Sequence, residues 1–152
     1  WDPKFCVQNP PAEFLKQECH KNAIWIMRHA EALPEVHITD VRVEDVGGPV
    51  KKVSAVIENF GYLPTCITNK AKSLGTIKKD VAELIPLEGL SIVGQAKQEV
   101  DFLEGYLNGG RERVAKSAVR VTWMVRQTEK TGRFRVKFRS QRGGTAEAEG
   151  VV

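Results

Sequence analysis

Residues 118–139, which read AVRVTWMVRQTEKTGRFRVKFR, decide the fold. Apolar and polar side chains alternate here, before and after a turn signal at Gly132. The apolar row consists of Val119, Val121, Trp123 and Val125 in the first half, and of Phe134, Val136 and Phe138 in the second. A period of two is typical of a strand with one buried face. We therefore expect strands at 118–126 and 133–139, whose apolar rows form the centre of a core.

Shorter stretches with the same alternation come earlier in the chain, separated by turn signals. They predict strands at 41–44, 53–58, 78–85, 90–94 and 99–104, and a last short strand is expected near Val151. The segment Asn59–Pro64 is interpreted as a turn, with a positive φ at Gly61. Seven or so short strands with turns between them predict an all-β fold, an antiparallel β-sandwich of immunoglobulin or fibronectin type.

A different period occupies residues 11–33 and predicts one long N-terminal α-helix. Its apolar stripe recurs every three or four residues, at Leu15, Cys19, Ala23, Ile26, Ala30 and Leu33. Asn9 is the expected helix cap, the first twelve residues are otherwise expected to be irregular, and Pro34 ends the helix. We divide the chain into a segment 1–34 and a sandwich domain 35–152.

The predicted helix carries more apolar surface than a small sandwich would cover. Phe14, Ile24, Trp25 and Met27 lie outside the narrow stripe. Large exposed apolar patches usually mark interaction sites. We expect residues 14–27 to be a docking surface, through which the isolated chain can also associate with itself.

The composition describes an ordinary folded domain. Of the 152 residues, 41% are hydrophobic and 28% charged, and no apolar run reaches the roughly 18 residues that span a bilayer. The three cysteines are Cys6, Cys19 and Cys66. No Cys-x-x-Cys pair is present, which excludes a zinc ribbon and a redox pair. We expect small, partly buried thiols, and a bridge between any two of them stays open.

Positive charge gathers near the C-terminus. Residues 111–142 hold eleven basic and two acidic side chains, for a net charge of +9, in a chain whose total is +4. If the strands at 118–126 and 133–139 pair, their outward side chains would form one basic face, and polyanion or nucleic-acid binding is the alternative function. The aromatic side chains of these strands point inward and cannot stack on bases. Specific nucleic-acid binding is therefore not expected.

No set of side chains converges for catalysis or metal binding. His20 and His29 are nine residues apart on the predicted helix, half a turn out of phase. His37 and Asp40 are three apart on a predicted strand and face opposite ways unless a bulge intervenes. No serine lies in a Gly-x-Ser-x-Gly elbow, and no glycine pair leads into a phosphate loop. We predict no catalytic, cofactor-binding or metal-binding residue in this chain.

Several segments along the chain carry a resemblance to a known family. The opening Trp1-Asp2-Pro3-Lys4-Phe5-x-x-Gln8-Asn9-Pro10-Pro11, with the helix end Arg28-His29-Ala30-x-x-Leu33-Pro34, resembles the tail end of a bacterial branch of the zinc carboxypeptidase (carboxypeptidase A-like) family. The stretch Val56-Ile57-Glu58-Asn59-Phe60-Gly61-Tyr62-Leu63-Pro64-Thr65 is similar to a signature of the β-sandwich that follows the peptidase there. The closing Trp123-x-Val125, Gly132 and Ser140-x-x-Gly143-Gly144-Thr145 fit the same sandwich.

The resemblance implies a non-catalytic accessory region, formed by a closing helix and a sandwich that packs on or positions an upstream catalytic domain. The parent protein would remove C-terminal residues from peptides with zinc-activated water. The family's zinc ligands and its glutamate base map to no position in this chain, so zinc is expected only in the upstream catalytic domain. The chain opens at Trp1, and any secretion signal is expected upstream. A periplasmic or extracellular location stays open.

Overall fold

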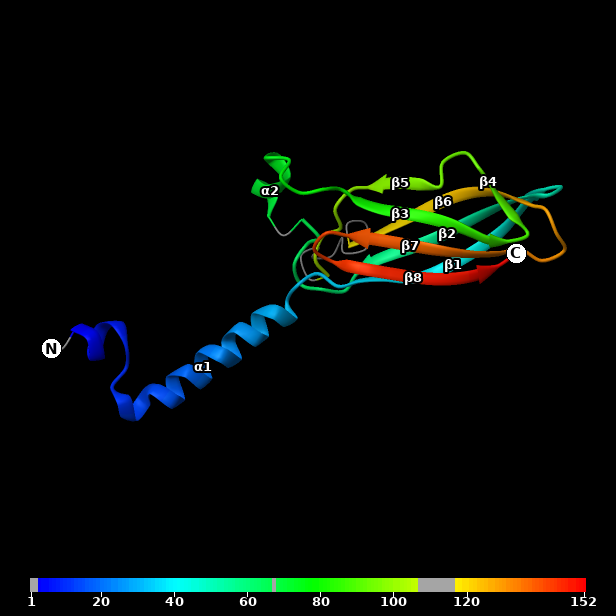
Figure 1. The fold of residues 1–152 in the computed structure, drawn as a ribbon. Coiled ribbons are helices and arrows are strands. Elements are labelled where there is room, and N and C mark those ends of the chain that lie inside the picture. The colour runs from blue at the N-terminus through cyan, green and yellow to red at the C-terminus, as the bar shows by residue number, and fades with distance from the viewer. Residues whose placement is uncertain (1–2, 67, 107–116) are drawn as a thin grey trace. The chain divides into compact units, whose positions relative to one another are not determined.

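A computed structural model describes residues 3–66, 68–106 and 117–152 (Figure 1). The chain divides into two compact units, Trp1–Ala32 and Leu33–Val152. Each is described by itself below. The first is helical and the second is an antiparallel β-sandwich.

The first unit contains the short π-helix η1 (Pro3–Gln8) and the α-helix α1 (Ala12–Glu31). The predicted long helix is confirmed, whereas the expectation of irregular chain is wrong for residues 3–8. Pro11 precedes the helix, where its missing N–H costs nothing. Asn9 is not the cap, since its backbone and side-chain N–H groups both donate to the carbonyl of Lys4, at 3.0 and 3.2 Å. Within this unit, no described side chain of α1 is buried.

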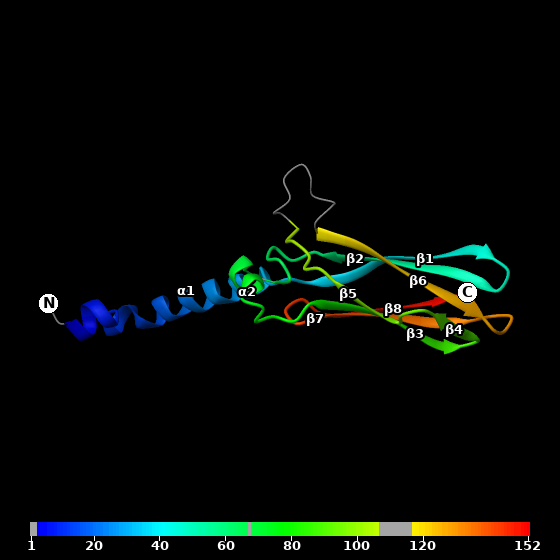
Figure 2. The ribbon, with the colours of Figure 1, turned by 90° about the horizontal axis from the view of Figure 1, so that it is seen from above.

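Two four-stranded antiparallel sheets form the second unit. Sheet A has the order β1-β2-β6-β4 and sheet B the order β5-β3-β7-β8. The strands of sheet A are β1 (Val36–Gly47), β2 (Val50–Asn59), β6 (Ala118–Gln127) and β4 (Leu90–Val93). Those of sheet B are β5 (Lys97–Val100), β3 (Asp80–Glu88), β7 (Arg133–Ser140) and β8 (Gly144–Val151), and the short helix α2 (Asn69–Ser73) precedes β3. Figure 2 shows the sheets as two layers. The predicted sandwich is confirmed.

The core lies between the two sheets. Trp123 on β6 is 2% exposed, and Phe134, Val136 and Phe138 on β7 are fully buried. The indole N–H of Trp123 donates to the carbonyl of Ala96 at 3.0 Å, so this buried donor is satisfied. Both predicted apolar rows therefore face inward, but they meet across the sandwich from opposite sheets.

The two basic strands do not pair with each other, as a common basic face would require. β6 pairs with β2 and β4, whereas β7 pairs with β3 and β8. Their outward cations thus lie on different sheets and form no common basic face among the described residues. Three further basic residues of this stretch, Arg111, Arg113 and Lys116, lie outside the described residues.

On sheet B, glutamates neutralise much of the positive charge of β7. Arg135 lies opposite Glu149 of β8, with their side chains 2.7 Å apart, and Arg133 reaches the same carboxylate at 3.3 Å. Lys137 pairs with Glu147. These cations hold the pKa values of both glutamates below their usual range, chiefly through the hydrogen bonds of Lys137 to Glu147 and of Arg135 to Glu149. The result is a ladder of paired charges.

The last strand is longer than expected. β8 reads GTAEAEGV, a sequence with low intrinsic β-propensity. Every one of its residues from Gly144 to Val151 nevertheless has a partner on β7. Gly150 lies against the ring of Phe134, where a β-carbon would overlap it. Pairing with a neighbouring strand, rather than local preference, forms this strand.

Candidate docking surface at the entry end of the sandwich

Asn59, at the end of β2, holds together the end of the sandwich where the chain enters from Leu33. Its side-chain oxygen accepts from the backbone N–H groups of Glu35 and Gly61, both at 3.0 Å. Its amide nitrogen donates to the carbonyls of Leu63 and Glu104, at 2.8 and 3.1 Å. Only 1% of the residue is exposed. All four hydrogen-bonding positions of the side chain are therefore used, and they tie three separate segments together.

Two glycines allow these segments to approach each other. A β-carbon on Gly61 would overlap the carbonyl oxygen of Leu33, and one on Gly105 would overlap that of Tyr62. Gly61 does not have the positive φ predicted from sequence. It is a glycine because another backbone passes directly beside it. Thr65 adds a further tie, since its hydroxyl and its N–H bond to the N–H and C=O of Leu103, both at 2.9 Å.

This framework presents exposed aromatic side chains, which we call the entry aromatic cluster: His37, Phe60, Tyr62 and Tyr106. Phe60 and Tyr106 stack with their centroids 5.8 Å apart, and His37 meets Phe60 edge-on at 5.2 Å. The three larger rings are each about half exposed, at 47% for Phe60, 51% for Tyr62 and 46% for Tyr106. Aromatic side chains grouped this way on a rigid backbone are typical of protein interaction surfaces.

The histidine of this cluster does not form a metal site with Asp40. A bulge between Ile38 and Asp40 does interrupt the pairing of β1, as such a site would require. Each side chain is bound elsewhere, however: His37 Nε2 lies 2.9 Å from Glu35, and Asp40 lies 2.8 Å from Arg42. In residues 3–66, 68–106 and 117–152, no group of three or more His, Cys, Asp or Glu side chains is placed to hold a metal ion.

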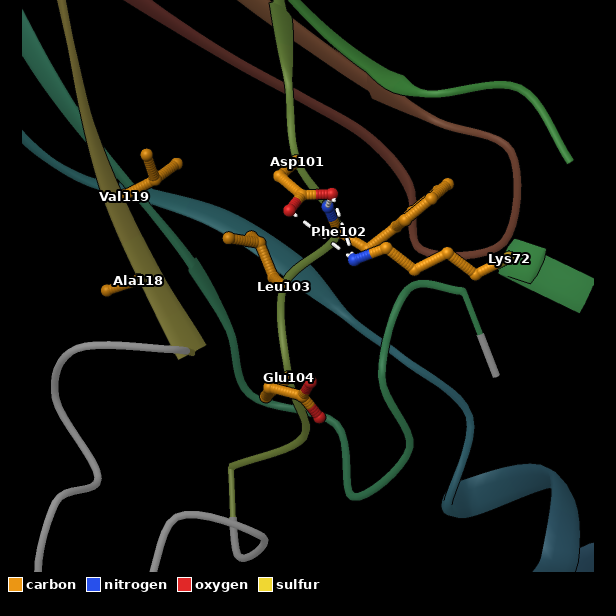
Figure 3. Close-up of a pocket in the computed structure, with 7 residues that line it drawn as sticks. All are labelled: Lys72, Asp101, Phe102, Leu103, Glu104, Ala118 and Val119. Carbon is orange, nitrogen blue, oxygen red and sulfur yellow. Dashed lines mark hydrogen bonds and ion pairs between the residues drawn. The ribbon is translucent and has the colours of Figure 1, made fainter. Parts of the chain in front are cut away.

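A pocket of about 320 Å³ opens between α2, the segment after β5, and the start of β6 (Figure 3). Lys72 reaches from α2 to the carboxylate of Asp101 at 3.2 Å, and its ammonium lies 5.5 Å from the centroid of the Phe102 ring. The backbone N–H of Phe102 and the ammonium of Lys72 lower the pKa of Asp101. Leu103 is 3% exposed and belongs to the core. The ion pair balances the charges of Lys72 and Asp101, and the carboxylate of Glu104 also lines the pocket.

Two buried polar groups lie near this end of the sandwich. Both carboxylate oxygens of Asp80 are buried and have no partner at hydrogen-bonding geometry among the described residues. Burial raises the pKa of Asp80, and the nearby hydroxyls of Thr65 and Ser140 lower it by a smaller amount. Burial likewise raises the pKa of the Cys66 thiol, which keeps it protonated and unreactive at neutral pH. Neither group resembles a poised catalytic residue.

The cysteines differ from the expectation in one respect. Cys66 is a buried free thiol and Cys19 is an exposed one, so the prediction of partial burial is wrong for Cys19 within its unit. The side chain of Cys6 lies outside the described residues.

None of the helices described here is long and apolar enough to cross a membrane.

One family model matches the chain, over residues 35–151, and the family is described as a domain of unknown function (DUF8731). No curated protein matches the chain. The match begins at Glu35, whose backbone N–H donates to Asn59, and includes all the strands of the sandwich.

Several solved structures are similar to this chain at low sequence identity. The GAE domain of GGA2p from Saccharomyces cerevisiae is 12% identical, with a TM-score of 0.42, and the match covers 80% of this chain and 87% of that one. A conjugative transposon lipoprotein from Bacteroides eggerthii is 11% identical, with a TM-score of 0.40 and coverages of 78% and 94%. The archaellum periplasmic stator protein FlaG from Sulfolobus acidocaldarius is 14% identical, with a TM-score of 0.36 and coverages of 78% and 100%.

Proposed function

The chain belongs to the family described as a domain of unknown function (DUF8731), and we propose that its sandwich is a non-catalytic accessory domain that docks on a catalytic domain preceding it in the same polypeptide. The entry aromatic cluster is the docking surface. The preceding domain would be a zinc carboxypeptidase-like enzyme that removes C-terminal residues from peptides.

The position of the entry aromatic cluster carries the proposal. Phe60 donates its backbone N–H to the carbonyl of Glu35 at 2.8 Å, and Gly61 beside it packs against the backbone of Leu33. Whatever precedes Leu33 in the polypeptide therefore joins the sandwich directly beside these exposed rings. A covalently attached partner reaches such a surface at high effective concentration, so a modest aromatic interface suffices.

The helix α1 supports the same role. Trp25, Ile26 and Met27 are each more than 60% exposed, and Phe14 and Leu15 are nearly half exposed. Most stability of a helix in a protein comes from packing of its apolar face rather than from propensity. An apolar surface of this kind requires a cover, and the catalytic domain that we propose upstream would supply one.

The parent's class rests on the resemblance of residues 1–34 and 56–65 to the zinc carboxypeptidase family. The described residues do not fit a zinc site, so the metal would be held by upstream residues and nothing in this chain would take part in the reaction. The contribution of this chain would be to hold the catalytic domain in place.

The sequence of the coding region upstream of Trp1 tests the parent's class. We expect a His-x-x-Glu pair, a later histidine and a glutamate shortly before Trp1. If these are missing, the assignment to carboxypeptidases is wrong, although docking on another kind of domain would remain open to the next experiment.

Variants of the full-length polypeptide test docking. Phe60→Ser combined with Tyr106→Ser should speed up proteolysis between the two domains and lower the melting temperature of the catalytic domain. Leu87→Ser combined with Val93→Ser is the matched control, since these side chains are 40% and 46% exposed but lie on β3 and β4. Equal effects of the two double variants would contradict docking through the aromatic cluster.

A further inference from the structure

A second feature of the sandwich is a basic pocket on the outward face of sheet B. Its volume is about 610 Å³, and it lies over the start of β3, around Val81. We define the basic pocket by the lining residues that matter below: Lys78, Lys79, Lys97, Arg139, Gln141 and Thr145. They come from the segment before β3, from β5, from the end of β7 with the turn after it, and from β8. The pocket thus draws on every strand of the sheet.

The charges around the basic pocket are not balanced. Glu83 lies between two of the cations, 2.6 Å from Arg139 and 3.4 Å from Lys97, and Glu99 lies 3.0 Å from Lys79. The side chain of Lys78 has no ion-pair partner in the described part of the chain. Four cations thus share two carboxylates, which leaves a surplus of two positive charges at a single concave site. Such a surplus attracts anions.

One backbone contact positions the unpaired lysine. The backbone N–H of Lys78 donates to Oε1 of Gln141, at 3.1 Å, across 63 residues of sequence. Because the amide oxygen is used in this way, the NH₂ group of Gln141 is left to donate to a ligand. The hydroxyl of Thr145, opposite Arg139 in the register of β7 and β8, is a further donor.

The positive surplus along the rest of β7 is smaller than that at the basic pocket. Arg133 and Arg135 share Glu149, and Lys137 has Glu147. These three outward cations of β7 thus share two carboxylates, which leaves a surplus of one positive charge, whereas the four cations of the basic pocket have a surplus of two. Most of the described cations in 111–142 are therefore in ion pairs, and the basic pocket combines Arg139 with three lysines from outside that stretch.

We propose that the basic pocket binds a small molecule that carries a phosphate or sulfate group. Ammonium and guanidinium donors form their strongest hydrogen bonds with such oxyanions. The volume lies within the range of roughly 300–1,000 Å³ that is usual for small-molecule sites. None of its described lining residues is aromatic, so the pocket lacks the stacking surface that single-stranded nucleic acids require.

Titration of the whole chain with inorganic pyrophosphate and, separately, with sodium sulfate tests the proposal. Binding is measured by the chemical shifts of the backbone amides and by calorimetry. Saturable binding with shifts confined to residues 78–81, 97 and 139–145 is expected. The probe with the lower Kd identifies the preferred oxyanion. A poly-dT oligonucleotide is the third probe.

Two charge-matched double variants complete the test. Lys78→Gln with Lys79→Gln should raise the Kd for the preferred probe about tenfold or more, since two charge-assisted hydrogen bonds are lost. Lys70→Gln with Lys130→Gln removes the same charge from exposed positions elsewhere and should change the Kd less than about twofold. Unchanged melting temperatures show that both variants fold.

Three results would overturn the proposal. The first is the same loss of affinity in both double variants, which would indicate attraction by net charge alone. The second is a lack of saturation with either oxyanion. The third is oligonucleotide binding that is tighter than either oxyanion and insensitive to the change at Lys78 and Lys79.

Discussion

Asn59, Gly61 and Thr65 have a structural role in the sandwich. All three lie in the stretch that resembles a family signature, yet each is used to fix backbone to backbone. Asn59 is buried and fully hydrogen-bonded, and Gly61 makes room for the chain at Leu33. The sequence shows that a turn lies here but not which distant segments it meets. The entry aromatic cluster could not be predicted for the same reason, because Phe60 and Tyr106 meet only after folding.

Truncation of the central aromatic residue tests the assignment of faces. Trp123→Ala should lower the free energy of unfolding by roughly 3–5 kcal/mol, because it leaves a cavity between the sheets and removes the hydrogen bond from the indole to the carbonyl of Ala96. Arg135→Ala, on the exposed face of β7, should leave the free energy of unfolding almost unchanged. Denaturant unfolding of the two variants measures both values. Comparable losses would mean that the two faces have been assigned wrongly.

Asp80 predicts an unusual dependence of stability on pH. Burial raises the pKa of this carboxyl in the folded protein, so the folded state holds the proton more tightly than the unfolded chain does. Its contribution to stability is fully present below the unfolded pKa and is lost as the pH rises through the raised folded value. Asp80→Asn should remove this loss and stabilise the protein at pH 8 by roughly 1–3 kcal/mol, the usual cost of an unpaired buried polar group.

Asp101→Asn is the control for Asp80. The backbone N–H of Phe102 and the ammonium of Lys72 lower the pKa of Asp101, so its contribution is present above the unfolded pKa and is lost as the pH falls. Thermal unfolding between pH 3 and 8 should therefore show opposite trends for the two variants relative to the native protein. Parallel curves for Asp80→Asn and the native protein would contradict the role given to Asp80.

The positions of the strands along the chain were predicted better than the pairing between strands. Alternation placed β2, β6 and β7 to within a few residues, because the period of a strand is a local property. The pairing of β6 with β2, and of β7 with β3 and β8, depends on distant segments that no local pattern identifies. The strand predicted at 99–104 lies instead at Lys97–Val100, because the chain leaves the sheet after Val100 and inserts Leu103 into the core.

The helix α1 is expected to make the isolated chain self-associate. Its exposed apolar side chains between Phe14 and Met27 would be covered by a second copy when no other partner is present. Sedimentation velocity over a range of concentrations should show a rise in average mass for residues 1–152 but not for residues 35–152. A monomer in both cases would show that the helix is an ordinary part of the chain rather than a docking element.

We expect the whole chain to have no catalytic activity of its own. In the part of the chain that the structure describes, no group of three or more His, Cys, Asp or Glu side chains is placed to hold a metal ion, and burial raises the pKa of the Cys66 thiol. Metal analysis after purification without chelator should find no stoichiometric zinc. Incubation with unblocked peptides and added zinc should release no C-terminal residue. Stoichiometric zinc, or zinc-dependent release by the pure chain, would refute the accessory role.

The anchoring of Glu35 by Asn59 also has a mechanical consequence. Val36 enters the sandwich beside Gly143, whereas Val152 leaves it beside Gly132, at the other end of β7. Tension applied between these two points runs along β1 and β8, parallel to the strands (Figure 1). The hydrogen bonds that join β1 to β2 and β8 to β7 would then be loaded together rather than one after another. We therefore expect the sandwich to resist stretching between Val36 and Val152.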